Sequence, residues 1–377
     1  MWRNYLLLLS MNIMVVSLCG MWIMYFPLYA SEYLGLSSEL IGLIYTLSSI
    51  SPVIGTMTGG LVADTIGKKK AIAIGFTISI ASLAVMLTNN AITLCTGFIT
   101  YFFGIAFLSP AISVLVLESA PQKIQGTLFM FATRVAPSMP PLVTLPLAGY
   151  LYEKGMYTTN ILIGIIGLLV AMSMTYFIKE IGGSVRKDLG STLRWLMNLA
   201  SKDRVFLVLV LTFGLNWLLI EGLEWYVPIY LRRIGFGAVE YGLTMGLASL
   251  AVAIGALASG GMVDKLGPRI ACITGWSLAA LASLIFVVTP FLSLAMLFMW
   301  KVVGLLPEAV PPTVIARRYS ENKTIALSAF NTATRLISIA GPLIIGLIST
   351  YHATAPFILR VILLLLSSVL VYTYLRL

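Results

Sequence analysis

A ten-residue segment of this chain occurs twice, 200 positions apart. It reads GLVADTIGKK from Gly60 to Lys69 and GGMVDKLGPR from Gly260 to Arg269, and long apolar runs flank each copy. The identity continues upstream at the same offset, at Gly42/Gly242, Leu43/Leu243, Leu47/Leu247, Ser49/Ser249, Ile54/Ile254 and Gly55/Gly255. A repeat of this length predicts a chain built from two related halves.

The apolar runs place these halves in a membrane. Hydrophobic residues make up 59% of the 377-residue chain and charged residues 10%, whereas a soluble domain carries about 25% charged residues. Runs of about 20 apolar residues can cross ~30 Å of hydrocarbon as helices, and they lack the alternation of a β-barrel. We therefore predict an all-α polytopic membrane protein with twelve transmembrane helices, at residues 4–30, 37–63, 70–88, 91–118, 126–153, 158–179, 204–230, 238–263, 269–289, 291–317, 323–350 and 354–376.

The lysines and arginines of the loops and span ends indicate the orientation. Seventeen of them fall on one side of the membrane and three, Lys154, Arg232 and Arg233, on the other. Because cytoplasmic loops carry the excess of positive charge, both termini are expected in the cytoplasm, in a multi-pass protein of the cell (plasma) membrane. This distribution accounts for the net charge of +10 without nucleic acid as a partner.

The longest connection separates two six-helix bundles. We predict an N-terminal bundle at 1–179, a cytoplasmic linker at 180–203 and a C-terminal bundle at 204–377. Apolar residues recur at helical spacing within the linker, which predicts a short amphipathic helix on the inner membrane surface. The repeat extends beyond the linker, because Ala132–Arg134 matches Ala333–Arg335 at an offset of 201.

With twelve spans, a central loop and this motif, the chain resembles the major facilitator superfamily of secondary transporters. The superfamily's signature between spans two and three is G-x-x-x-D-x-x-G-[KR]-[KR]. Its members here are Gly60, Asp64, Gly67, Lys68 and Lys69. A degenerate second copy between spans eight and nine is also typical, and its members are Gly260, Asp264, Gly267 and Arg269. The resemblance covers nearly the whole chain and implies alternating access, with two pseudo-symmetric six-helix bundles rocking around a central cavity.

The acidic residues of the motif are expected to act as cytoplasmic latches. The resemblance places Asp64 beside the start of span eleven, near Lys323. A carboxylate facing a helix N-terminus is stabilised by about 0.3–1 kcal/mol when exposed and up to ~2 kcal/mol when partly buried. Such a contact can break when the cytoplasmic side opens, and Asp264 against the start of span five would be its counterpart. The alternative is a tight turn with stop-transfer lysines.

Three glycines are expected to let span two approach a neighbour closely: Gly55, Gly59 and Gly60.

Ionisable residues inside membrane spans are costly, so each is a functional candidate. The candidates for a substrate and proton pathway are Arg134, Lys301, Arg335, Glu221, Glu224 and Glu308, with Asn331 on the same helix face as Arg335. The basic members could line a cavity for an anionic substrate, and a glutamate could carry a proton. The alternative is that these charges form neutralised pairs that hold the two halves together. Glu118 and Arg360 lie nearer span ends and are expected to snorkel.

Metal, cofactor and enzyme chemistry find little support in the sequence. The three cysteines lie in apolar spans without metal-like spacing, and His352 is the single histidine. No G-x-x-x-x-G-K-[ST] motif occurs, which excludes ATP-driven transport by this chain alone. We expect no metal, no cofactor and no enzymatic activity; a membrane-embedded enzyme and a transporter-like sensor are the alternatives from other classes.

The expected function is secondary active transport of a small organic solute, coupled to protons, with an anionic substrate. The chain is expected to act as a monomer in the lipid bilayer. Hydrophobic drug or metabolite efflux is the alternative, because the spans are so apolar. The superfamily's antiporter signature in span five, G-x-x-x-G-P-x-x-G-G, is not met around Pro140 and Pro141, which weakens an antiport assignment.

Overall fold

The structure, a computed structural model of residues 1–377, describes residues 2–88, 90–119, 121, 128–129, 131–179, 203–289, 292–319 and 323–374. Most of the predicted linker at 180–203, including its amphipathic helix, lies outside the described residues. The chain divides into two compact units. Unit 1 comprises Met1–Arg186 with Gly235–Ser249, and unit 2 comprises Lys187–Ile234 with Leu250–Leu377. The predicted bundle boundaries stay a prediction.

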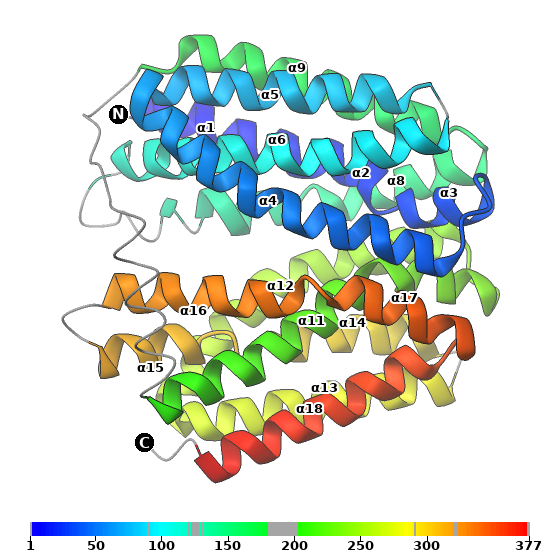
Figure 1. Ribbon diagram of the computed structural model, residues 1–377, viewed down its shortest axis with the longest axis vertical. Helices are drawn as coiled ribbons and strands as arrows, with labels where there is room; N and C mark the ends of the chain where they lie inside the picture. Colours follow the sequence, from blue (N-terminus) through cyan, green and yellow to red (C-terminus); the bar gives the residue numbers. More distant parts are fainter. Residues whose placement is uncertain are drawn as a thin grey trace. The chain divides into compact units, whose positions relative to one another are not determined.

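Helices make up both units (Figure 1). The first part of the chain forms α1 (Trp2–Met14), η1 (Val15–Cys19), α2 (Gly20–Ile23), α3 (Phe26–Glu32), α4 (Ser38–Ile66), α5 (Lys68–Met86), α6 (Ala91–Glu118), η3 (Phe131–Val135), η4 (Ala136–Ser138), α8 (Pro141–Glu153) and α9 (Tyr157–Phe177). The second part forms α11 (Arg204–Arg233), α12 (Ala238–Leu266), α13 (Pro268–Val288), α14 (Ser293–Val303), α15 (Val310–Arg318), α16 (Lys323–Ser338), α17 (Gly341–Tyr351) and α18 (Ala355–Tyr374).

Nine helical segments among the described residues are long and apolar enough to cross a membrane. They correspond to nine of the twelve predicted spans. The predicted spans at 126–153 and 291–317 are interrupted among the described residues. Span five passes through the π-helical η3 and the 3₁₀-helical η4 before α8 starts at Pro141, and span ten is interrupted by a turn at 304–309 between α14 and α15. Prolines near both breaks remove backbone donors and crowd the preceding turn, which ends a helix.

Small residues bring α4 and α6 together within unit 1, where Figure 1 shows α4, α5 and α6 side by side. A Cβ added at Gly55 would lie 2.6 Å from the carbonyl oxygen of Phe103, and one at Gly59 would lie 2.6 Å from the carbonyl carbon of Phe107. Both distances are far below van der Waals contact, so the predicted close approach is confirmed for these glycines. It is wrong for Gly60, where a Cβ would meet nothing within 4 Å.

The start of α12 packs on the end of α8, which is why Gly235–Ser249 belongs to unit 1. The Tyr25 hydroxyl donates to the carbonyl oxygen of Leu145 at 2.8 Å and lies 3.1 Å from that of Ala238. The carboxylate of Glu153 accepts hydrogen bonds from the backbone N–H groups of Ala238 at 2.8 Å and Val239 at 3.4 Å. This carboxylate therefore satisfies the first free N–H groups of α12.

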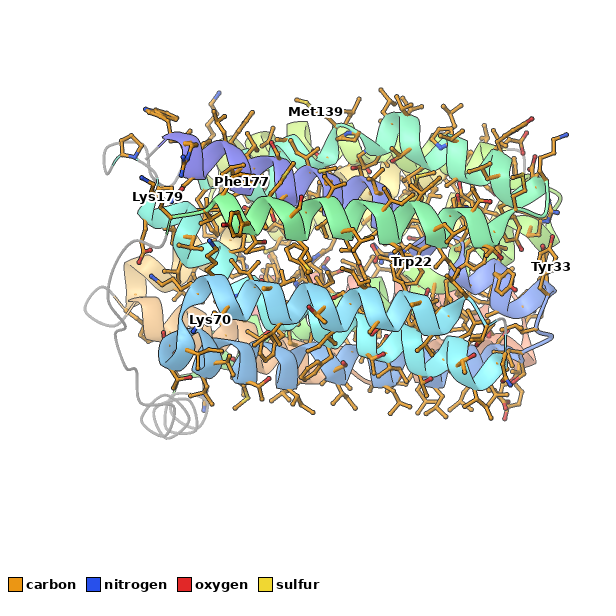
Figure 2. The ribbon with its side chains drawn as sticks, turned by 90° about the horizontal axis from the view of Figure 1, so that it is seen from above. Trp22, Tyr33, Lys70, Met139, Phe177 and Lys179 are labelled. Carbon is orange, nitrogen blue, oxygen red and sulfur yellow. The ribbon has the colours of Figure 1, made fainter. Side chains whose placement is uncertain are left out.

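The two ends of unit 1 differ in chemistry. Figure 2 shows Lys70 and Lys179 at one end of this unit and Tyr33 at the other. Trp22 lies between them, fully buried, with its ring packed edge-on against Tyr101 at 4.8 Å. The predicted orientation puts the lysine-bearing end at the cytoplasmic surface, whereas tyrosines are common at both surfaces of a membrane.

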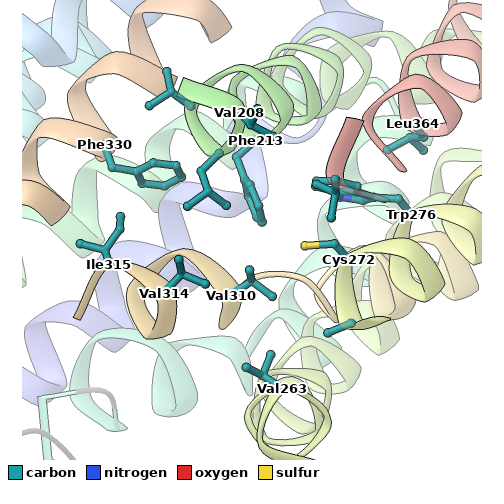
Figure 3. Packing of buried hydrophobic residues seen from close by; sticks show 14 of the residues in the cluster. Val208, Phe213, Val263, Cys272, Trp276, Val310, Val314, Ile315, Phe330 and Leu364 are labelled. Carbon is teal, nitrogen blue, oxygen red and sulfur yellow. The ribbon is translucent and has the colours of Figure 1, made fainter. Parts of the chain in front are cut away.

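Unit 2 has an apolar core around α11, α13, α15 and α16 (Figure 3). Phe213 lies at its centre, with ring centroids 5.1 Å from Trp276 and 5.9 Å from Phe330. Cys272 is buried in this core and is a free thiol. The core holds α11 against the helices that carry the charged residues described below.

Candidate functional site

An ion pair joins two membrane helices of unit 2. The Lys301 ammonium on α14 donates to the Glu224 carboxylate on α11 at 2.6 Å. The Lys301 side chain is 19% exposed and that of Glu224 is 51% exposed. Lys301 lies in the last turn of α14, just before the break at 304–309, rather than in the middle of a continuous span. The carbonyl end of a helix favours a cation, so the break helps to hold this lysine at membrane depth.

Glu221, one helical turn before Glu224, has a different partner. Its carboxylate accepts a hydrogen bond from the Ser338 hydroxyl on α16 at 3.0 Å, and Arg335 on α16 lies near enough to act on its charge. The neighbouring Gly222 fixes this arrangement, because a Cβ there would lie 2.8 Å from the carbonyl oxygen of Gly341 at the start of α17. The close crossing of α11 with α17 therefore sets Glu221 against the end of α16.

Asn331 and Arg335 lie on one exposed face of α16, as the i, i+4 spacing predicts. The adjacent stripe of α16, formed by Phe330, Thr334 and Ser338, is buried. The structure thus brings five of the predicted site residues onto neighbouring helices of unit 2: Glu221, Glu224, Lys301, Asn331 and Arg335. We call these residues the α11/α14/α16 polar cluster.

The other two candidates are placed elsewhere in the chain. Glu308 is exposed in the turn at 304–309 between α14 and α15. The backbone of Arg134 lies in the π-helical turn η3, and its side chain lies outside what the structure describes. Their roles in a substrate or proton pathway stay predictions.

The first copy of the repeated motif forms a turn with two bound lysines. Gly67 has φ +104°, a backbone conformation that glycine adopts at little cost. Lys68 is buried and forms an ion pair with Glu118 at the end of α6, at 2.5 Å. The carboxylate of Glu118 is therefore held by Lys68 at the end of α6. Lys69 donates to the carbonyl oxygen of Tyr176 at 2.5 Å and lies 5.0 Å from the centre of that ring.

The second copy repeats part of this arrangement in unit 2. Gly267 has φ +83°. Arg269 donates to the carbonyl oxygen of Tyr372 and lies 4.3 Å from the centre of its ring. The last cation of each copy thus binds a tyrosine near the end of α9 or α18, where free carbonyls favour a cation.

The acidic residues of the motif are Asp64 in α4 and Asp264 in α12. Asp64 is exposed in the last turn of α4, and the side chains of Gly260 and Asp264 lie outside what the structure describes. The predicted latch contacts of Asp64 and Asp264 stay predictions.

A further carboxylate caps the first helix of unit 2. Asp203 precedes α11 and accepts from the backbone N–H of Val205 at 2.9 Å. It also accepts from Arg318 Nε at 2.7 Å and from the Tyr319 hydroxyl at 2.5 Å. Burial raises the pKa of this carboxyl, but the hydrogen bonds from Arg318 and Tyr319 outweigh burial and hold its pKa below the ordinary value. Sequence reasoning did not single out this residue, although an aspartate just before an apolar run is a recognisable N-cap signal.

Arg360 was expected to snorkel, and this prediction is wrong. It lies six residues into α18 and is 0% exposed. Its guanidinium lies over the ring of Trp300 at 4.1 Å. The side chain points toward α13 and α14 rather than toward the membrane surface, a direction that depends on packing and cannot be read from the position of Arg360 in its span.

These features agree with the comparisons to known proteins. A family model described as Major Facilitator Superfamily matches residues 8–310. The chain belongs to this superfamily. It is a multi-pass membrane transporter with the superfamily's twelve-helix fold. A search of curated proteins finds no match to the sequence.

Solved transporters share the fold across the whole chain. A bacterial homologue of the human lysosomal transporter Spinster has a TM-score of 0.80 at 17% identity, covering 99% of this chain and 98% of that one. The nucleoside transporter NupG has a TM-score of 0.78 at 14% identity, with 99% of each chain covered. A D-xylose–proton symporter has a TM-score of 0.75 at 14% identity, covering 99% and 97%. At these identities the likeness shows the fold, and the cargo of this chain must be argued from its own residues.

Proposed function

We propose that this superfamily transporter is a secondary active carrier of a small organic solute with an anionic group, coupled to protons and working by alternating access. We further propose that it acts in the plasma membrane with both termini in the cytoplasm, as a monomer without cofactor, metal or enzymatic activity. The observation that carries the proposal is the partly exposed Lys301–Glu224 pair in the α11/α14/α16 polar cluster.

Lys301 and Arg335 are the proposed anion-binding residues. A lysine held by one carboxylate that is half exposed can exchange that partner for a carboxylate on a solute, since both make the same charge-assisted hydrogen bond. Arg335 adds a second cation on an exposed helix face, beside the amide of Asn331. Charges at membrane depth that are not fully buried must face water or a ligand, because lipid does not solvate them.

Glu221 is the proposed proton carrier. Its partner is a serine hydroxyl, which can donate to a carboxylate and can accept from a carboxylic acid. Glu221 thus keeps a hydrogen bond in both protonation states, whereas an ammonium partner such as Lys301 can only donate. This makes Glu221 better suited to gain and lose a proton than Glu224.

The test is uptake by purified protein in liposomes with and without an imposed pH gradient, using solutes of low passive permeability. The panel contains glucuronate and gluconate, the dianion succinate, neutral glucose and uridine, and the lipophilic cation tetraphenylphosphonium. We expect protein-dependent accumulation of a sugar acid that is driven by the gradient. Transport of the lipophilic cation alone would instead establish efflux of hydrophobic compounds, and uptake unaffected by the gradient would refute proton coupling.

Two substitutions separate the roles. Lys301→Met should lower uptake by about tenfold or more, the loss of one charge-assisted hydrogen bond, while Lys301→Arg retains most of it. Glu221→Gln should abolish gradient-driven accumulation but leave exchange of labelled for unlabelled solute across the membrane. Equal loss of both activities in Glu221→Gln would contradict the proton role.

A further inference from the structure

The guanidinium of Arg360 lacks acceptors for most of its donors. Its Nε lies 3.2 Å from the Ser283 hydroxyl on α13, and no partner exists for Nη1 or Nη2 among the described residues. The side chain is fully buried in unit 2. Its remaining neighbours are the ring of Trp300 at 4.1 Å and Gly304, where an added Cβ would lie 4.0 Å from Nη2.

These neighbours compensate only part of the charge. A cation over an indole ring gains about 0.5–2 kcal/mol, and the carbonyl end of α14 adds about 0.3–2 kcal/mol. Removing a cation from water costs several kcal/mol unless an anion and hydrogen-bond acceptors replace the water. Arg360 therefore occupies a site that a carboxylate would stabilise, and none of the described residues places one in contact with it.

Glu224 is the carboxylate that the geometry connects with this charge. It is bound to Lys301, the chain neighbour of the Trp300 that Arg360 covers, and its charge acts on Arg360 electrostatically. Lys301 and Arg360 thus both lie at the C-terminal end of α14. Lys301 is partly exposed and bound to Glu224, whereas Arg360 is buried and short of acceptors.

We propose that Arg360 is a positioning residue that takes over Glu224 when an anion binds Lys301. In the empty site Lys301 and Glu224 neutralise each other, and Arg360 leaves one positive charge unbalanced. An anion on Lys301 displaces Glu224, which moves toward Arg360, so that two cations and two anions then balance.

The exchange between Lys301 and Arg360 stands on the geometry of unit 2, and its link to a solute rests on the proposed function. A double-mutant cycle without any solute tests the exchange itself. The variants are Glu224→Gln, Arg360→Met and their combination, made with Lys301 present and again with Lys301→Met, and the melting temperature of each purified protein is measured in detergent.

With Lys301 present, the effects of the two substitutions should be nearly additive, because Lys301 holds Glu224. In the Lys301→Met background Glu224 should pair with Arg360, and the cycle should show a coupling of roughly 2–6 °C. Arg360→Lys keeps the charge, so its cycle with Glu224→Gln should show a smaller coupling than the cycle with Arg360→Met. If Arg360→Met does not fold, Glu224→Gln in the Lys301→Met background replaces it, and this substitution should lower the melting temperature because Arg360 then loses its anion. Additivity with Arg360→Met, or an unchanged or higher melting temperature of Glu224→Gln in the Lys301→Met background, would overturn the proposal.

Uptake of glucuronate and succinate in liposomes tests the link to an anion. Arg360→Met should weaken uptake of the transported anion by about tenfold, and Arg360→Lys should restore part of it. Coupling in the cycle together with no anion uptake would show that the exchange exists and that the proposed function is wrong. Anion uptake that is unchanged in Arg360→Met would refute the positioning role.

Discussion

Adjacent glycines in α4 should respond to the same substitution in opposite ways. A Cβ at Gly59 would lie 2.6 Å from the carbonyl carbon of Phe107, about 0.8 Å inside the 3.4 Å at which ordinary contact begins (3.4 minus 2.6 Å). The obstacle is backbone of α6, which cannot rotate away as a side chain can. A Cβ at Gly60 would meet nothing within 4 Å, so this position provides a control with the same chemical change.

The magnitudes follow from this geometry. Overpacking of a well-packed interface costs about 1–3 kcal/mol, and the rigid carbonyl places the cost of Gly59→Ala toward the upper end of this range. The better helix propensity of alanine offsets up to ~1 kcal/mol of this cost. Gly60→Ala should be neutral or stabilising by up to ~1 kcal/mol. The two variants should therefore differ by about 2–3 kcal/mol, or roughly 4–12 °C in melting temperature.

The assay is thermal unfolding of both purified variants in one detergent, with transport measured in liposomes on the same preparations. If Gly59→Ala is as stable as Gly60→Ala, the α4–α6 packing argued above is incorrect. Loss of transport in Gly60→Ala at unchanged stability would instead place Gly60 in a conformational step, a role that the packing of this structure does not require.

Three further predictions concern charged groups at helix ends. Asp203→Asn keeps an oxygen that can cap α11 and removes the charge bound by Arg318, so it should lower the melting temperature less than Asp203→Ala. Folding lowers the pKa of Asp203, so its charge stabilises the folded state fully above the ordinary pKa. This stabilisation is lost as the pH falls through the pKa of the folded state. The melting temperatures of wild type and Asp203→Asn should therefore converge in acid and differ near neutral pH. Glu118→Gln should destabilise by about 1–3 kcal/mol, since it removes an anion bound to the buried ammonium of Lys68. Adding Lys68→Met should recover part of this loss, and strictly additive effects would contradict the pairing. Lys69→Met should speed amide hydrogen exchange in the last turn of α9, and unchanged exchange there would show that Lys69 does not stabilise this helix end.

The sequence predicted the helix positions well where the signal was local. Nine spans could be placed from apolar run length alone, because about 20 apolar residues are required to cross the hydrocarbon wherever the helix lies in the bundle. The prolines of span five predict a kink, but the exact places where spans five and ten are interrupted could not be predicted. A proline can either bend a continuous helix or end it, and the neighbouring helices decide which occurs.

Partner choice in the polar cluster could not be predicted from spacing. Glu221 and Glu224 share one face of α11, yet one contacts Ser338 on α16 and the other Lys301 on α14. The residues of each contact are 117 and 77 positions apart in the chain. Only the packing of three helices determines which of these side chains meet.

The sequence by itself determined that this protein spans the membrane many times, that it is built from two related halves and that it belongs among facilitator-type transporters. These properties follow from composition, run length and a repeated motif, all of which are local or periodic. The tertiary structure decided which glycines are packed against backbone, that Glu118 binds Lys68, and that Arg360 is buried beside Trp300 rather than snorkelling. Each of these outcomes depends on what a distant helix places against the residue, and in a membrane that neighbour decides whether a charge is neutralised or left available for a ligand.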